Sequence, residues 1–159
     1  MSGWKKHLII GLITQILILI IIEIIGVLLL DKWLLGIKEV IILTPLLFIN
    51  PLLPDIDHPS SKITKALLII SLIGLTAGFV KAIFFGNNTI NNFLILSYAL
   101  LAITIIISNF VKHRGFTHKT ITSIIYATII GVATMNPYIG LITLGGYQSH
   151  LILDNKKED

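Results

Sequence analysis

The sequence predicts an all-α fold of the polytopic membrane class, a bundle of about six transmembrane helices. First, 55% of its residues are hydrophobic and 13% are charged, against roughly 45–50% and 25% in soluble domains. Second, its apolar runs approach or reach the roughly 17–25 residues that a spanning helix needs. Third, the segments between these runs are short and polar. This composition excludes an ordinary water-soluble core.

The first apolar run covers residues 8–30 and follows Lys5 and Lys6, as the apolar region of a signal peptide would. That region of a signal peptide is only about 7–15 residues long and precedes a small-residue cleavage site. This run meets neither condition. It therefore predicts a permanent span.

Five further runs predict the remaining helices. They cover residues 37–53, 63–85, 90–111, 120–135 and 137–153. Pro45 and Asn50-Pro51 interrupt the second run, so this segment is either a kinked span or a re-entrant one. The sequence thus predicts one transmembrane domain over residues 1–154 and a short polar tail over 155–159.

Lysine and arginine predict the orientation, because their excess marks the cytoplasmic side of a membrane protein. Nine of them fall in one set of alternate loops and termini, and three lie near the other membrane face. Both termini are therefore expected in the cytoplasm, in a multi-pass membrane protein. The nine are Lys5, Lys6, Lys62, Lys65, Lys112, Arg114, Lys119, Lys156 and Lys157.

All five histidines lie close to the predicted cytoplasmic helix ends, and three aspartates accompany them. No histidine or aspartate entered the orientation argument, so the two observations are independent. Because the chain has no cysteine, a metal ion there must be held by imidazole, carboxylate or water. The eight candidate ligands are His7, Asp55, Asp57, His58, His113, His118, His150 and Asp154.

The spacing of these residues supports a shared site. His150 and Asp154 are four residues apart and so project from one face of a helix. Pro54 and Pro59 stiffen the loop that carries Asp55, Asp57 and His58. In the segment His113-Arg114-Gly115-Phe116-Thr117-His118, Thr117 is expected to cap the fifth helix, and Ser60 or Ser61 is expected to cap the third.

Eight donors exceed the roughly four that one zinc ion takes. The sequence therefore predicts a divalent metal centre, with zinc as the expected ion, two ions as an option and manganese as an alternative. Paired ions suit phosphoester hydrolysis. Asp57 and Arg114 are the predicted catalytic residues, the arginine because its guanidinium binds phosphate.

Three sequence blocks resemble the signatures of the YdjM-like family of inner-membrane-associated metal-dependent hydrolases. They are Leu53-Pro54-Asp55-Ile56-Asp57-His58-Pro59-Ser60-Ser61, His113-Arg114-Gly115-Phe116-Thr117-His118 and Gly146-Tyr147-Gln148-Ser149-His150-Leu151-Ile152-Leu153-Asp154. The resemblance implies a membrane-bound hydrolase whose metal is held by histidine and aspartate, distantly similar to helical zinc phospholipase C enzymes. This sequence departs from the family pattern at Lys119, where relatives usually have serine.

We therefore expect a phosphoester hydrolase with a lipid or lipid-linked substrate. A metal or ion transporter and a structural membrane protein with a stabilising metal are the alternatives. A transporter would need polar residues along a path through the bilayer, and these are sparse. Nucleic-acid binding is not expected, because the cations sit between apolar runs rather than on a soluble face. A metalloprotease is disfavoured because the sequence has no HExxH motif.

Overall fold

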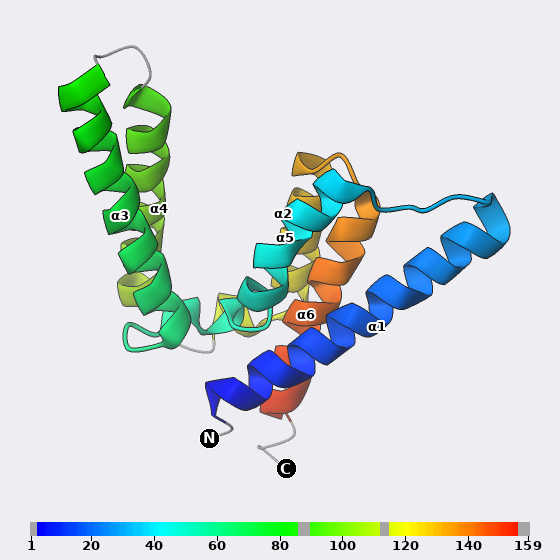
Figure 1. Ribbon diagram of the computed structural model, residues 1–159. Coiled ribbons are helices and arrows are strands. Elements are labelled where there is room, and N and C mark those ends of the chain that lie inside the picture. The colour runs from blue at the N-terminus through cyan, green and yellow to red at the C-terminus, as the bar shows by residue number, and fades with distance from the viewer. Residues whose placement is uncertain (1–2, 86–89, 112–114, 156–159) are drawn as a thin grey trace. The chain divides into compact units, whose positions relative to one another are not determined.

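The computed structural model describes residues 3–85, 90–111 and 115–155. Within these ranges it is all-helical, and each of the six apolar runs corresponds to one α-helix (Figure 1). The predicted all-α fold is confirmed. The helices are α1 (Trp4–Leu30), α2 (Ile37–Ile49), α3 (Lys62–Phe85), α4 (Ile90–Phe110), α5 (Thr120–Ala133) and α6 (Pro137–Asn155), with short 3-10 turns η1 (Leu53–Asp57) and η3 (Phe116–His118).

Two helices in the described part of the chain are long and apolar enough to cross a membrane. They are Trp4–Leu30 and Lys62–Lys81. Helices α2 and α5 contain 13 and 14 residues, fewer than the roughly 17–25 of a straight span. The structure therefore supports two membrane spans by length and composition, and the six-span topology stays a prediction.

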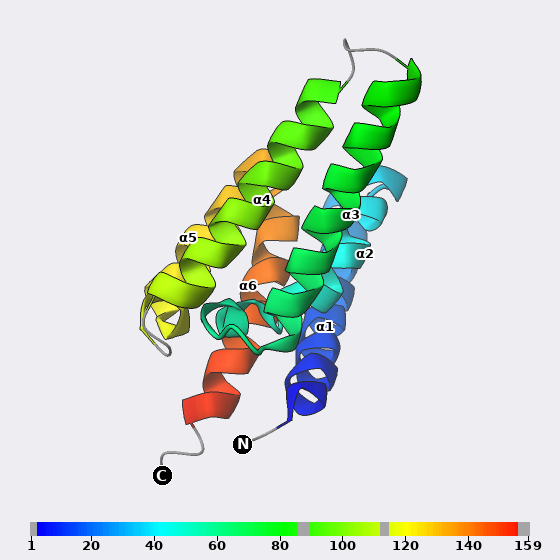
Figure 2. The ribbon, with the colours of Figure 1, turned by 90° about the vertical axis from the view of Figure 1, so that its left-hand side faces the viewer.

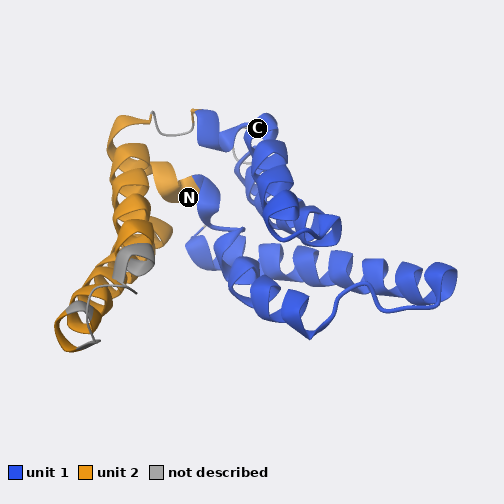
Figure 3. Ribbon diagram, turned by 90° about the horizontal axis from the view of Figure 1, so that it is seen from above, with its two compact units in different colours: residues 1–54, 116–159 blue, residues 55–115 orange. Residues whose placement is uncertain are grey.

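The chain divides into two compact units (Figure 3). Unit 1 comprises residues 1–54 and 116–159 and contains α1, α2, α5 and α6. Unit 2 comprises residues 55–115 and contains α3 and α4. That the two units form one transmembrane domain, as the sequence predicts, stays a prediction.

Helix α6 is the centre of unit 1, because it packs against α1, α2 and α5. Its Ile139 and Ile142 are fully buried and join Ile22 of α1 and Leu43 of α2 in the apolar core. The rest of α1 carries many exposed isoleucine and leucine side chains. An apolar surface of that extent is typical of a lipid-facing helix.

A tight turn sets α5 and α6 side by side. Met135 adopts a left-handed conformation with φ 51°, and the Asn136 amide donates to the Gly131 carbonyl at 3.0 Å. This is the usual way to end a helix. The Asn136 side chain then accepts from the Tyr138 amide at 3.0 Å and so caps α6, with Pro137 at its first position.

The carboxylate of Glu23, within apolar α1, binds the loop that leads to α2. It accepts from the amides of Leu34 and Leu35 at 3.1 and 2.9 Å. A charged group in an apolar helix is costly unless it has polar partners. These two amides supply them.

Unit 2 is a helical hairpin in which α3 and α4 lie side by side (Figure 2). Glycines allow the close approach: a Cβ at Gly74 would overlap Ser97, and one at Gly78 would overlap Leu94. The hydroxyl of Ser61 accepts from the Thr64 amide at 3.1 Å. The prediction that a serine caps this helix is therefore confirmed.

Candidate metal centre

Glycines bring the start of α1 against the second half of α6. A Cβ at Gly11 would overlap Pro51, and one at Gly146 would overlap the side-chain amide of Gln15. Small residues at such positions let two helix backbones approach closely. As a result His7 of α1 stacks on His150 of α6, with ring centroids 4.0 Å apart and an angle of 22° between the planes.

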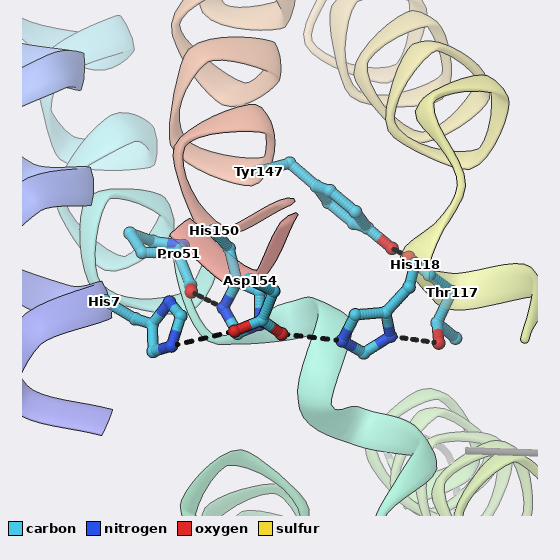
Figure 4. Close-up of polar contacts among 7 residues, drawn as sticks. All are labelled: His7, Pro51, Thr117, His118, Tyr147, His150 and Asp154. Atoms are coloured by element: carbon cyan, nitrogen blue, oxygen red, sulfur yellow. Dashed lines mark hydrogen bonds and ion pairs between the residues drawn. The ribbon is translucent and has the colours of Figure 1, made fainter. Parts of the chain in front are cut away.

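Three imidazoles converge on the carboxylate of Asp154 (Figure 4). The Nε2 atom of His7 lies 3.4 Å from Oδ1. The Nε2 atoms of His118 and His150 each lie 3.4 Å from Oδ2. Three segments far apart in the sequence, the start of α1, turn η3 and the end of α6, thus supply ring nitrogens to one carboxylate.

The cluster is withdrawn from solvent. The side chain of His150 is 0% exposed and that of His7 4%, whereas those of His118 and Asp154 are 9% and 13% exposed. Burying a carboxylate is unfavourable unless positive charge and hydrogen bonds compensate for it. A bound cation would provide that compensation, and the partly exposed side of His118 and Asp154 would leave it an entry path.

In His150 and His118, the second ring nitrogen lies close to a protein oxygen. Nδ1 of His150 lies 2.7 Å from the Pro51 carbonyl oxygen, and Nδ1 of His118 lies 3.2 Å from the Thr117 hydroxyl. The Tyr147 hydroxyl donates to the Thr117 carbonyl at 2.6 Å and so fixes turn η3. Metal-binding histidines usually bond through their second nitrogen in this way.

The donor set and its spacing fit a divalent ion. Charge-assisted N–H···O bonds are about 2.7–2.9 Å long, shorter than the 3.4 Å found between the His nitrogens and Asp154. Tetrahedral zinc with ligands at about 2.0–2.1 Å would set them about 3.3–3.4 Å apart. The ligand atoms of His118, His150 and Asp154 lie within 4.8 Å of one another. This group could therefore hold a metal ion.

The structure thus brings together four of the eight predicted ligands, and all four belong to unit 1. Three of the others, Asp55, Asp57 and His58, belong to unit 2, and their part in the site stays a prediction. The His58 side chain is exposed, and its Nδ1 accepts from the Ser60 amide at 3.2 Å. His113 and Arg114 lie outside the described residues.

The predicted role of Thr117 as the cap of α5 is wrong. Helix α5 begins after Lys119, which makes no capping bond through its side chain. Turn η3 comes between Gly115 and the helix, so Thr117 lies two residues too early to cap it. Its hydroxyl contacts His118 instead.

The sequence analysis assigned no role to Tyr147 or Asn50. Tyr147 bonds to Thr117, which precedes His118, and Asn50 precedes Pro51, whose carbonyl contacts His150. Tyr147 belongs to the third motif block, and its hydroxyl needs a partner when the ring is buried. Asn50 interrupts an apolar run, and a polar side chain inside such a run is a functional candidate. Those two signals were available in the sequence.

No curated protein and no solved structure matches the chain. The model of the YdjM inner membrane protein family matches residues 1–157, which include every histidine and every residue of the centre. The match agrees with the apolar helices and confirms the family that the three motif blocks indicated. The chain belongs to the YdjM inner membrane protein family.

Proposed function

We propose that this protein is a membrane-bound metal-dependent hydrolase that cleaves a phosphoester bond in a lipid or lipid-linked substrate at the cytoplasmic membrane face. The observation that carries the proposal is the convergence of three imidazole Nε2 atoms on Asp154, each at 3.4 Å. His7, His118, His150 and Asp154 would hold the ion. The family's place in the inner membrane supports a substrate that reaches the site from the bilayer.

The ion would supply two things that the side chains lack. It would stabilise negative charge on a phosphoryl group and make a water molecule nucleophilic at neutral pH. In the reaction the oxygen of water bonds to phosphorus, the bond from phosphorus to the leaving oxygen breaks, and a proton goes to that leaving oxygen. Asp57 is proposed to take the proton of the attacking water, and Arg114 to bind the phosphate.

Both oxygens of Asp154 face imidazole nitrogens, which supports a place for two ions. His7 lies at Oδ1, while His118 and His150 lie at Oδ2. With donors at both of its oxygens, Asp154 would help to hold both ions, and such a pair would stabilise the attacking and the leaving oxygen in phosphoester hydrolysis. Asp55, Asp57, His58 and His113 are the proposed further ligands.

The proposed topology has six membrane segments and both termini in the cytoplasm. Single cysteines at Asn88 and Lys156, introduced into this cysteine-free chain, should react with an impermeant thiol reagent from opposite sides. Labelling from the same side would contradict the topology and the shared membrane face of the histidines.

The test of the function is the metal content of the purified protein, measured by mass spectrometry after purification without chelators. We expect one or two zinc or manganese ions per chain, and release of phosphate or of a phosphorylated headgroup from a phospholipid or a prenyl diphosphate. Protein that stays metal-free after incubation with both metals would contradict the proposal.

A substitution at Arg114 distinguishes a loss of catalysis from a loss of the metal site. Arg114→Ala should leave the metal content intact and abolish turnover, because a guanidinium binds phosphate but cannot ligate a cation. Arg114→Lys is the matched variant, which keeps the charge and loses the fork of donors.

A metal-stapled structural protein is the second candidate, and the burial of His7 and His150 favours it. A structural ion has a closed coordination shell, whereas a catalytic ion keeps an open position. If metal is bound and Arg114→Ala loses it together with thermal stability, the ion is structural.

A further inference from the structure

A cluster of buried polar side chains lies inside unit 1, beside the metal centre. Gln15 of α1, Asn50 at the end of α2 and Thr143 of α6 are each 0% exposed. The Asn50 amide nitrogen donates to Gln15 Oε1 at 2.9 Å and to Thr143 Oγ1 at 3.3 Å. Its Oδ1 accepts from the Tyr126 hydroxyl of α5 at 3.1 Å. One side chain thus joins all four helices of the unit.

The polar atoms of the cluster bond to one another and to nearby backbone carbonyls. The cluster is therefore a rigid element rather than a ligand site. The Gln15 amide nitrogen donates to the carbonyls of Leu47 and Gly11, at 2.9 and 3.2 Å. Both protons and the oxygen of the Asn50 side chain have partners as well. A fully bonded polar network in a region of low dielectric holds its members in one arrangement.

The network determines where the next carbonyl points. Asn50 has helical angles, φ −55° and ψ −44°, although a residue before proline usually prefers an extended backbone. Its amide donates to the Leu46 carbonyl at 2.9 Å, and its side chain is held by three helices. The ring of Pro51 fixes the following φ angle. The Leu52 amide, which shares a peptide plane with the Pro51 carbonyl, donates to the Ile49 carbonyl at 3.0 Å. With Asn50 and the Pro51 ring also held, the Pro51 carbonyl is aimed at His150.

That carbonyl selects the tautomer of His150. A carbonyl oxygen only accepts, so the contact of 2.7 Å requires the proton on Nδ1 of the imidazole. The lone pair of a neutral ring then lies on Nε2, the atom that faces Asp154 at 3.4 Å. A ring with the proton on Nε2 would present a donor to the centre and could not bind a metal there.

We propose that Asn50 is a positioning residue for the metal centre: through Pro51 it holds His150 in the tautomer whose Nε2 can bind a divalent cation. This inference rests on the proposed function for the identity of the cation, and on the hydrogen-bond geometry alone for the tautomer. Tyr126 supports the same arrangement through its bond to Asn50 Oδ1.

The experiment uses the full-length protein in detergent and compares Asn50→Ala and Tyr126→Phe with wild type. Nitrogen-15 NMR of histidine-labelled, metal-free protein reports the tautomer of His150, with the signal assigned from a His150→Gln variant. Zinc affinity is measured by competition with a chromophoric chelator. The control is Thr104→Val, which removes an equally buried hydroxyl that bonds to the Leu100 carbonyl of its own helix.

We expect wild type and the Thr104 control to show His150 as the single tautomer with the proton on Nδ1. Asn50→Ala should give a mixture of tautomers and lower zinc affinity by about 10–100-fold, the usual effect of losing an outer partner of a ligand. Tyr126→Phe should act in the same direction by a smaller factor, because the Asn50 side-chain nitrogen still donates to Gln15 and Thr143. If Asn50→Ala does not fold, Tyr126→Phe tests the positioning role in its place.

A purely structural role would lower thermal stability and leave the tautomer and the zinc affinity of the folded protein at wild-type values. That result in a folded Asn50→Ala protein, or in Tyr126→Phe if Asn50→Ala does not fold, overturns the inference. A wild type that binds no zinc contradicts the proposed function. The positioning of His150 would still stand in that case if the tautomer responds to the Asn50 substitution.

Discussion

Several buried polar side chains make different kinds of contact in the two units of this protein. In the hairpin of unit 2, Ser71 and Thr104 each donate to the carbonyl four residues earlier in the same helix. In unit 1, Asn50 and Tyr147 bond to partners in other segments of the unit. Bonds within a helix satisfy a polar group without positioning anything else, whereas bonds between segments determine how they meet.

In an apolar chain of this kind, a functional site is expected where polar side chains link different segments. Both units pack around glycines, since Gly146 in unit 1 and Gly74 in unit 2 each leave room for one polar side chain. Only the unit 1 side chain, Gln15, extends the contact into a network that ends at a histidine. Close packing alone is thus common to both, and the polar links distinguish the unit that carries the centre.

The largest effect is expected from breaking the centre itself. Asp154→Ala should lower zinc affinity by more than about 100-fold, because it removes the carboxylate on which three imidazoles converge and loss of an outer partner alone costs about 10–100-fold. Equilibrium dialysis with zinc measures the effect. Glu39→Ala, which removes a carboxylate that bonds the Gly36 amide, is the control and should bind zinc normally.

The next largest effect is expected from substitutions at the two glycine contacts, Gly146 in unit 1 and Gly74 in unit 2. A methyl group at Gly146 would overlap the Gln15 amide, and one at Gly74 would overlap Ser97. We expect Gly146→Ala and Gly74→Ala each to lower the free energy of unfolding by about 1–3 kcal/mol, as overpacking does. Only Gly146→Ala should also weaken zinc binding. Equal loss of zinc in both variants would remove the distinction between the units.

A smaller effect is expected from the hydroxyl that holds turn η3. Tyr147→Phe removes the bond to the Thr117 carbonyl, which should lower stability by about 1 kcal/mol and zinc affinity by about tenfold through His118. Thermal unfolding with and without zinc checks both values. Tyr98→Phe, at an exposed tyrosine of the hairpin, should change neither.

The smallest effect is expected inside the hairpin. Ser71→Ala removes a hydroxyl that bonds to the Leu67 carbonyl of its own helix. The bond is local to one helix and positions no other segment, so we expect a change below about 1 kcal/mol and normal zinc binding. A large loss of stability here would show that unit 2 also depends on specific polar contacts.

The all-α class, the six helical segments and the family can all be predicted from the sequence alone. These follow from local properties: apolar runs form helices because their backbone groups must bond internally, and the motif blocks are contiguous in the chain. The sequence also identified His7, His118, His150 and Asp154 as candidates, since few other side chains in so apolar a chain can hold a metal.

Which donors meet, and how they are held, depends on packing between distant segments. The meeting of His7 with His150 depends on the close approach at Gly11 and Gly146, which are separated by most of the chain. The hydrogen bond from His150 to Pro51 depends on where a carbonyl points after an interrupted helix. Packing and carbonyl direction result from contacts between distant segments, and no local pattern of residues encodes them.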